Sequence, residues 1–372
     1  MSERLVGTRN SPQASGFGLI ELMIALALGS LLVLTVATLF SDSSRALTEI
    51  NRSGRHLETG LYAMDRIAAE LSLVGYWGEA DTPIDADDQV YGVLRSSETG
   101  DLEVLGYPAV PPLCVGSGVT GFDPRVELGF AMEFPLLSDL GSQLNATMSA
   151  SACGAGATTA SAASAFFAIR RASTCATGEA GVAATNRCRA LENGFHLQTN
   201  GCRDPNDNLE GGEVKLHRVS DASVASLLPY TRYDCQTNAP IYRFISRIYY
   251  VSQSDELIRL RLDYVGAGAG TYVEELVAEG VEHLVFEWFI DSTGNGQYDR
   301  VETTLTPQDA GNVVGAKIWL VVRSLQPRSD FEDVSTYTIA GQPWTAPDGM
   351  RNYPRALHSR MVALPNIAGR RK

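Results

Sequence analysis

The sequence Phe17–Phe40, FGLIELMIALALGSLLVLTVATLF, decides the fold class of this chain. Its 24 residues include one charged side chain, Glu21, near the start of the run. A helix of about 20 apolar residues is long enough to cross a bilayer. An acidic residue inside such a helix costs about 3 kcal/mol at the bilayer centre, so its presence indicates a partner or a function. We therefore expect a membrane-spanning helix in which this carboxylate has a specific role.

The residues before the run, Met1–Gly16, form a polar and weakly basic leader. A basic leader before an apolar core is also typical of a secretory signal peptide, for which Thr35 and Ala37 would supply small residues at a cleavage site. The core of a signal peptide is usually about 7–15 residues long, which is shorter than this run. The length favours a retained membrane helix, and cleavage after Ala37 is the alternative.

The helical pattern continues beyond the apolar run. Apolar or small residues recur at alternating spacings of three and four, and charged residues occupy the other faces. No proline occurs between Phe17 and Val74, and Gly75 is a typical C-terminal stop. We expect one helix with a membrane-spanning half, residues 17–40, and an amphipathic half, residues 41–75. A separate surface helix is the alternative for the second half.

The region after the helix, residues 76–372, predicts a globular domain whose C-terminal third is rich in β-strands. Segments rich in β-branched and aromatic residues alternate there with turn-forming clusters. These segments are Tyr242–Val251, Leu257–Val265, Val281–Ile290 and Ala316–Ser324, and shorter strand-like pieces precede them at Leu102–Tyr107 and Val126–Met132. We expect an α+β fold in which an antiparallel sheet packs on the amphipathic half of the long helix.

The middle of this domain, about residues 141–240, differs in composition. Gly141–Ala165 is rich in Ala, Ser, Gly and Thr, which predicts a flexible or loosely packed insertion. The middle of the chain also holds all the cysteines, which are Cys114, Cys153, Cys175, Cys188, Cys202 and Cys235. An even number of cysteines after an export segment favours disulfides over zinc, because no CxxC pair is present. Six cysteines allow about 15 pairings, so the connectivity stays open.

Charge and motifs argue against two classes of function. The net charge is −13, so binding of nucleic acid through its phosphates is unfavourable. Five scattered histidines show no HExxH spacing, and the chain contains no GxSxG, P-loop or dinucleotide-binding fingerprint. We therefore expect a protein that is not an enzyme.

One loop has the ligand spacing of an EF-hand-type calcium site. The segment Asp291–Glu302 reads DSTGNGQYDRVE, with glycine at the sixth place, where such loops turn sharply. The candidate ligands are Asp291, Thr293, Asn295, the carbonyl of Gln297, Asp299 and Glu302. Thr293 stands where Asp or Asn is usual, and strands rather than helices flank the loop. The residues slightly favour a Gly-rich hairpin turn with solvated acids over a Ca²⁺ site of modest affinity.

Two groups of motifs resemble a known family. The segment Gly16–Ala25, GFGLIELMIA, resembles the type III signal of type IV prepilins. The segments Asp65–Leu71 with Val74–Gly78, Arg247–Val251, Gly280–Phe286 and Ala316–Ser324 resemble the PilW minor pilins. The resemblance implies a pilin-like fold, cleavage after Gly16 by a prepilin peptidase, and N-methylation of Phe17. It also implies that Glu21 pairs with the terminal amine of a neighbouring subunit.

The same resemblance implies a minor pilin that primes assembly of a Gram-negative type IV pilus, at its tip. The implied partners are other minor pilins, the major pilin and the inner-membrane assembly platform. Before assembly the chain would cross the inner membrane once, with its C-terminal domain in the periplasm. Arginines flank both ends of the apolar run, so their count does not settle this orientation, whereas the cysteines favour export. The alternatives are a minor pseudopilin of type II secretion and a membrane-anchored periplasmic binding module.

Overall fold

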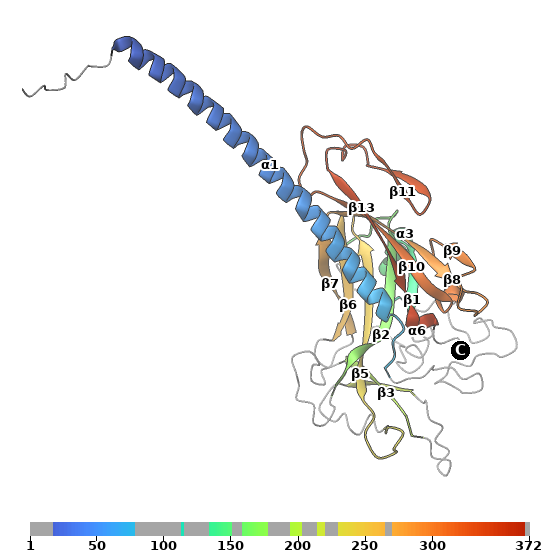
Figure 1. Cartoon of the computed structure of the whole chain (residues 1–372). Helices are drawn as coiled ribbons and strands as arrows, with labels where there is room; N and C mark the ends of the chain where they lie inside the picture. Colours follow the sequence, from blue (N-terminus) through green and yellow to red (C-terminus); the bar gives the residue numbers. More distant parts are fainter. Residues whose placement is uncertain are drawn as a thin grey trace, which may run out of the picture. The chain divides into compact units, whose positions relative to one another are not determined.

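A single long helix joins two parts of the chain (Figure 1). The computed structural model describes residues 18–78, 113–114, 134–150, 158–177, 194–202, 214–219, 230–264 and 270–368. The chain divides into two compact units, Met1–Gly54 and Arg55–Lys372. Helix α1, Leu19–Leu73, runs without a break through the border between them. The expectation of one continuous helix is confirmed, and the alternative of a separate surface helix is wrong.

The C-terminal end of α1 is defined by a glycine and by a distant asparagine. Gly75 has a φ of +72°, which glycine adopts without strain, and its N–H donates to the Arg170 carbonyl at 3.1 Å. The Asn366 amide donates to the carbonyls of Ser72 and Val74, both at 3.3 Å. The two bonds from Asn366 satisfy carbonyls at the end of the helix that have no partner inside it. The helix thus ends close to its predicted stop, and a residue near the C-terminus helps to hold it there.

The unit Arg55–Lys372 contains two larger antiparallel sheets. In the first, the strand order is β1-β2-β5-β3-β4, and β6 pairs with both β5 and β7. Its strands are β1 (Leu136–Leu140), β2 (Ala165–Thr177), β3 (Gly194–Thr199), β4 (Val214–Val219), β5 (Ile241–Val251), β6 (Glu256–Tyr264) and β7 (Gly270–Glu279). We call it the seven-stranded sheet.

The second sheet has the strand order β13-β10-β8-β9. Its strands are β8 (Val281–Ile290), β9 (Arg300–Glu302), β10 (Val313–Arg323) and β13 (Arg355–Ala363). A hairpin of β11 (Thr336–Ile339) and β12 (Gln342–Thr345) lies between β10 and β13 in the chain. The remaining helices in the described residues are short: α3 (Gly141–Ala150), α5 (Pro307–Ala310) and α6 (Pro365–Ala368).

The main core lies where the C-terminal half of α1 meets both sheets. On the helix, Ala63, Met64, Ile67, Ala68 and Leu71 are buried in one apolar cluster with residues of both sheets. Apolar residues on alternate positions of β8 and β10 complete it, as expected for strands with one face in a core. The sequence predicted one sheet against the helix, and the structure has two.

The predicted strands of the C-terminal third are confirmed as β5, β6, β8 and β10, with ends shifted by at most three residues. The prediction of a loosely packed insertion at Gly141–Ala165 is wrong for its start and its end. Residues 141–150 form α3, and Ala165 begins β2. The Asn145 side chain exchanges two hydrogen bonds of 2.9 Å with the backbone of Ala160, which is buried. The expected strands at 102–107 and 126–132 lie outside the described residues.

Candidate functional site

The predicted assembly residue, Glu21, lies in the first turn of α1. Its Oε2 accepts a hydrogen bond of 3.1 Å from the backbone N–H of Gly18, and its side chain is exposed. A carboxylate in this position satisfies one of the free N–H groups of the helix start and interacts favourably with the helix dipole. Gly16 and Phe17, the predicted cleavage and methylation residues, lie outside the described residues.

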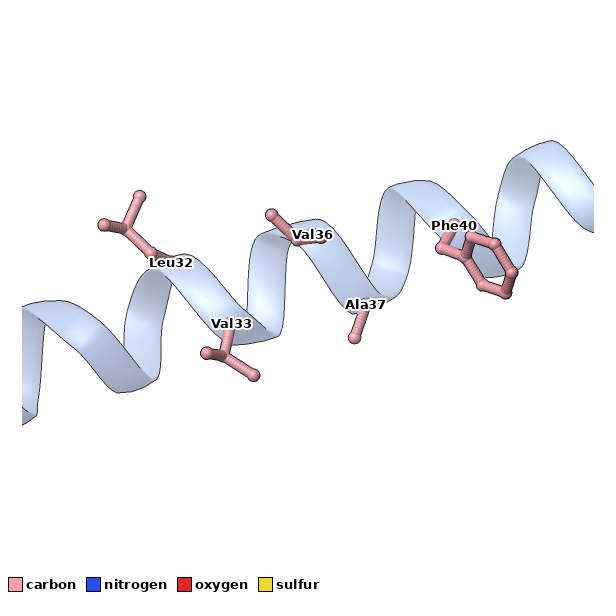
Figure 2. Close-up of a pocket in the computed structure, with 5 residues that line it drawn as sticks. All are labelled: Leu32, Val33, Val36, Ala37 and Phe40. Atoms are coloured by element: carbon pink, nitrogen blue, oxygen red, sulfur yellow. The ribbon is translucent and has the colours of Figure 1, made fainter.

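The apolar half of α1 exposes nearly all of its side chains. Residues Leu19–Thr48 have a mean hydropathy of 2.5 and are long and apolar enough to span a membrane. Figure 2 shows a shallow groove on this helix that is lined only by hydrocarbon side chains, those of Leu32, Val33, Val36, Ala37 and Phe40. Exposed apolar surface of this extent requires lipid or other protein to cover it.

The other half of α1 is attached to the seven-stranded sheet by a buried acid. Glu70 forms ion pairs with Arg171 of β2, at 3.5 Å, and with Arg247 of β5. Burial lowers the pKa of Arg171, and the neighbouring Glu70 opposes that effect. A buried guanidinium or carboxylate is stable only when it is paired, so Glu70 holds two strands and the helix in one arrangement. The sequence offered no signal for this pairing.

On the other flank, α1 meets strand β13. A Cβ added at Gly60 would lie 2.2 Å from Nε2 of His358, so only glycine lets the helix approach the strand this closely. One turn further on, Asp65 forms an exposed ion pair with Arg360. Burial, and secondarily the nearby His56, lowers the pKa of His358. Gly60 is therefore a packing residue.

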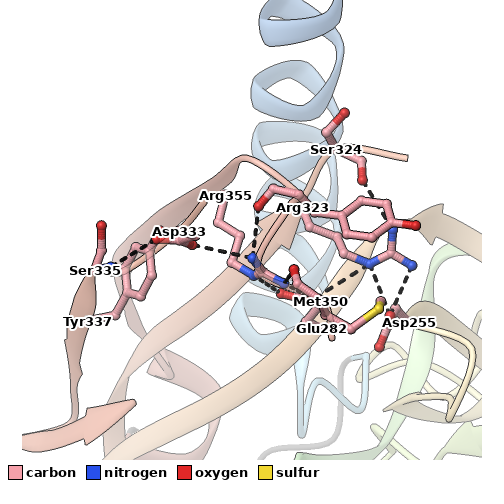
Figure 3. A network of polar contacts seen from close by, with 10 residues as sticks. Asp255, Glu282, Arg323, Ser324, Asp333, Ser335, Tyr337, Met350 and Arg355 are labelled. Atoms are coloured by element: carbon pink, nitrogen blue, oxygen red, sulfur yellow. Dashed lines mark hydrogen bonds and ion pairs between the residues drawn. The ribbon is translucent and has the colours of Figure 1, made fainter. Parts of the chain in front are cut away.

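A second buried network joins the two sheets to the β11–β12 hairpin (Figure 3). The Arg355 guanidinium donates to both carboxylate oxygens of Glu282, at 2.6 and 2.8 Å, and to Asp333 at 3.3 Å. Arg323 binds Asp255, in the turn between β5 and β6, at 3.0 Å. Bidentate pairs of this kind are strong and strict in geometry. The network is structural, and it defines how the hairpin sits on the four-stranded sheet.

The candidate calcium loop is organised by its own hydrogen bonds. Asp291 is buried, and its Oδ1 accepts backbone N–H bonds from Thr293, Gly294 and Asn295 at 3.2, 2.7 and 3.3 Å. Its Oδ2 accepts the N–H of Gly296 at 2.8 Å. These bonds make an Asx-type turn that is stable without a cation.

The remaining predicted ligands of the loop have partners of their own. Asp299 accepts from Ser292 at 2.8 Å, Asn295 accepts the N–H of Gln297 at 2.8 Å, and Glu302 pairs with Arg300 at 3.5 Å. Among the described residues, no group of three or more His, Cys, Asp or Glu side chains is placed to hold a metal ion. The six predicted ligands lie in one loop, but their carboxylates do not converge on a common point.

One of the predicted disulfides is described completely. Cys202 and Cys235 are bonded, which ties the end of β3 to the loop before β5. Cys114 and Cys175 are disulfide-bonded as well, whereas Cys153 and Cys188 lie outside the described residues. The prediction of disulfides rather than a zinc site is confirmed for the described cysteines.

Two regions of the chain match known families. Residues 12–37 match the prokaryotic N-terminal methylation motif. Residues 248–366, from within β5 to α6, match the type IV pilus-assembly protein W, PilW. Over these residues the chain is similar to PilW-like pilins. The PilW family is a pilus-assembly family rather than an enzyme family.

No curated protein shows significant sequence similarity to the PilW-like chain. A type IV-like pilin from Thermus thermophilus shares 12% sequence identity with it at a TM-score of 0.28, covering 55% of this chain and 78% of that one. Neither of the two family matches includes Glu70, Gly60 or the cysteines, so the roles given to these residues come from the structure alone.

Proposed function

We propose that this chain is a minor pilin of a type IV pilus, inserted as a prepilin and assembled through α1. The observation that carries the proposal is the division of one helix into two halves. Up to Thr48 its apolar side chains are exposed, and from Gly60 to Leu71 one face is buried in the chain's own core. A helix of this kind anchors a folded domain while leaving its apolar half free for lipid and then for neighbouring helices.

In this proposal, prepilin peptidase cleaves after Gly16 and the new terminal residue, Phe17, is methylated. Glu21 then pairs with the terminal amine of a neighbouring subunit, since a carboxylate in an apolar surrounding is stable only with a charged partner. The unit Arg55–Lys372 would lie in the periplasm, where an oxidising environment favours the Cys202–Cys235 bond. Its size favours the tip of the filament, where fewer neighbours crowd it.

The test begins with mass spectrometry of the mature N-terminus. A methylated Phe17 is the expected result, and an intact Met1 or a terminus at Thr38 would contradict the proposal. Glu21→Gln keeps a hydrogen-bonding oxygen for Gly18 but loses the charge. We expect cleavage and membrane insertion to persist in this variant while its amount in purified pili falls at least tenfold. Normal incorporation would contradict the role of Glu21.

A minor pseudopilin of a type II secretion system would share the cleavage, the methylation and the anchoring of α1. Deletion of the gene separates the two. Loss of twitching motility with normal secretion supports the pilus, and loss of secretion with normal twitching supports the pseudopilin.

Calcium binding by the loop Asp291–Glu302 stays a prediction of the sequence. Its test is calorimetric titration of the full chain with Ca²⁺, with Asp291→Asn as the matched variant. Heat released on Ca²⁺ addition to the wild type but not to the variant, together with a higher Tm of the wild type in Ca²⁺, would support the site. No heat and no shift in Tm would mean that the loop is a turn held only by its own hydrogen bonds.

A further inference from the structure

The contact between α1 and β13 holds a histidine nitrogen without a hydrogen-bond partner. Gly60 of α1 is buried, and a Cβ added there would lie 2.2 Å from Nε2 of His358 on β13. That nitrogen is itself buried and bonds to no group in the part of the chain that the structure describes. The imidazole therefore fills the space that a side chain at residue 60 would take.

This space suits a neutral imidazole and not an imidazolium ion. A protonated imidazole carries a hydrogen on both ring nitrogens, so Nε2 of His358 would become a charged donor that faces the helix at Gly60 without an acceptor. Burying such a donor is costly, and burial accordingly lowers the pKa of His358. Protonation is favoured only when the ring leaves the contact and reaches water.

On α1, the titratable and charged residues near His358 add to this cost. His56 lies one turn before Gly60 and so on the same flank of the helix, and its positive charge is the second cause of the lowered pKa of His358. The other charged residues of that turn, Arg55 and Glu58, are exposed. The carboxylate of Glu58 therefore lies in water, where it offsets a charge on His358 only weakly.

The strands beside His358 supply no compensating charge either. On β13, Arg360 is the next residue on the same face and is itself positive, and its ion pair with Asp65 of α1 is exposed. On β10, His358 lies opposite Leu320, which has no accessible surface. A protonated His358 would thus lie between an apolar residue and two cationic groups, Arg360 and His56.

The C-terminal part of α1 is held independently of this contact. Further along the helix, Glu70 forms its ion pairs with Arg171 and Arg247. Loss of the contact with β13 would therefore free only the turns of α1 next to Gly60. Local openings of this kind break few contacts and cost less free energy than global unfolding.

We propose that His358 makes the contact between β13 and α1 sensitive to acid. In neutral solution the ring is uncharged, and the turns of α1 around Gly60 lie against the strand. Below about pH 6.5, where a free imidazole takes up a proton, the separated state gains a proton that the closed contact excludes, so the contact is complete above that pH and weakens below it. The contact would thus set how far along α1 the folded domain holds the helix at a given pH. This inference does not depend on cleavage at Gly16 or on Glu21, so either proposal can fail alone.

Spin labels measure the separation directly. In the full chain in detergent micelles, the labels are attached to Met361→Cys of β13 and Glu58→Cys of α1, both at exposed positions. Double electron–electron resonance then gives the distribution of distances between the two labels at pH 7.5 and at pH 5.0. We expect a longer second distance whose population, relative to the short one, rises at least fivefold at pH 5.0, since full exclusion of one proton allows a factor of about 30. A control pair, Met361→Cys with Ala69→Cys, has its helix label next to Glu70 and should give the same distances at both pH values.

Variants of His358 show which group responds. His358→Phe keeps a ring in the contact but cannot be protonated, so the labels at residues 58 and 361 should stay at the short distance at both pH values. His358→Gln is a second variant that does not titrate, and it decides the question if the first does not fold. His283→Phe changes a histidine of β8 that stacks on Trp344 instead, and it should leave the response to acid unchanged.

Three results would overturn the proposal. The first is a wild-type distance distribution that is the same at pH 7.5 and pH 5.0. The second is a response to acid in His358→Phe or His358→Gln as large as that of the wild type. The third is an equal lengthening of the distance between the control labels, which would show that the whole domain loosens in acid.

Discussion

The two halves of α1 belong to one helix but obtain their stabilising contacts in different ways. In the half from Leu19 to Thr48, the apolar side chains are exposed, and Leu31 keeps 60% of its surface accessible. In the half from Gly60 to Leu71, one face is fully buried, and Leu71 has no accessible surface. The half from Gly60 to Leu71 packs against the chain's own sheets. The half from Leu19 to Thr48 must be covered by lipid or other proteins.

This difference shows how one helix can carry two functions. The buried half makes the sheet domain and the helix one folding unit, because its contacts come from strands of both sheets. The exposed half contributes little to the stability of that unit, and its apolar side chains are free to contact lipid or other protein. Substitutions in the buried half should therefore change the free energy of unfolding. Substitutions in the exposed half should change assembly.

The largest difference in unfolding free energy is expected between substitutions of two acids in the buried half of α1. Glu70→Ala leaves the buried Arg171 and the half-buried Arg247 without their carboxylate and should lower the free energy of unfolding by about 3–5 kcal/mol. Asp65→Ala breaks an exposed pair with Arg360 and should cost at most about 1 kcal/mol. Urea denaturation of the chain in detergent, followed by near-UV circular dichroism, measures both. Similar losses in the two variants would contradict the special role of Glu70.

The next comparison uses two leucines. Leu71→Ala opens a cavity in the core and should lower the free energy of unfolding of the sheet domain by about 2–5 kcal/mol. Leu31→Ala removes the same atoms from the exposed half, and we expect a change of at most about 0.5 kcal/mol. The same denaturation curves test this pair. An equally large effect of Leu31→Ala would show that the exposed half of α1 is packed on the domain as well.

A smaller effect is expected from the pH dependence of the sheet domain. Burial lowers the pKa of His283, which stacks on Trp344 of the hairpin, to about 4. The folded state therefore favours the neutral ring, while the unfolded chain takes up a proton near pH 6.5. The contribution of His283 is complete above pH 6.5 and falls by about 2–3 kcal/mol as the pH drops to 4. His283→Phe should flatten this part of the curve of unfolding free energy against pH, and an unchanged slope would contradict the assignment.

The smallest difference separates two glycines of α1. Gly60→Ala places a methyl group against the ring of His358 and should cost about 1–2 kcal/mol. Gly29→Ala meets no atom within 4 Å and should keep or raise helix stability by up to about 1 kcal/mol. Thermal unfolding of both variants gives the comparison. A stabilising Gly60→Ala would mean that His358 moves aside without cost.

Much of this fold could be predicted from local patterns in the sequence. The apolar run, the spacing of three and four and the glycine after Val74 predicted α1 to within two residues at either end. Alternating β-branched and aromatic residues predicted β5, β6, β8 and β10. Strand β13 was missed because its residues, RALHSRMVA, have no apolar alternation and an arginine at each of two positions. Helix α3 was missed because its Ala- and Ser-rich sequence packs through one leucine and one asparagine.

By itself, the sequence determined which part of the chain is long and apolar enough to cross a membrane, where the helix ends and that the described cysteines form disulfides. These features depend on side-chain polarity and on backbone preferences of neighbouring residues, which act over a few positions. The tertiary structure alone decided that Glu70 meets Arg171 and Arg247, which lie 101 and 177 residues away. It also decided that Gly60 of α1 lies against His358 of β13. Pairing between distant residues depends on how the sheets stack on the helix, and no local pattern records that.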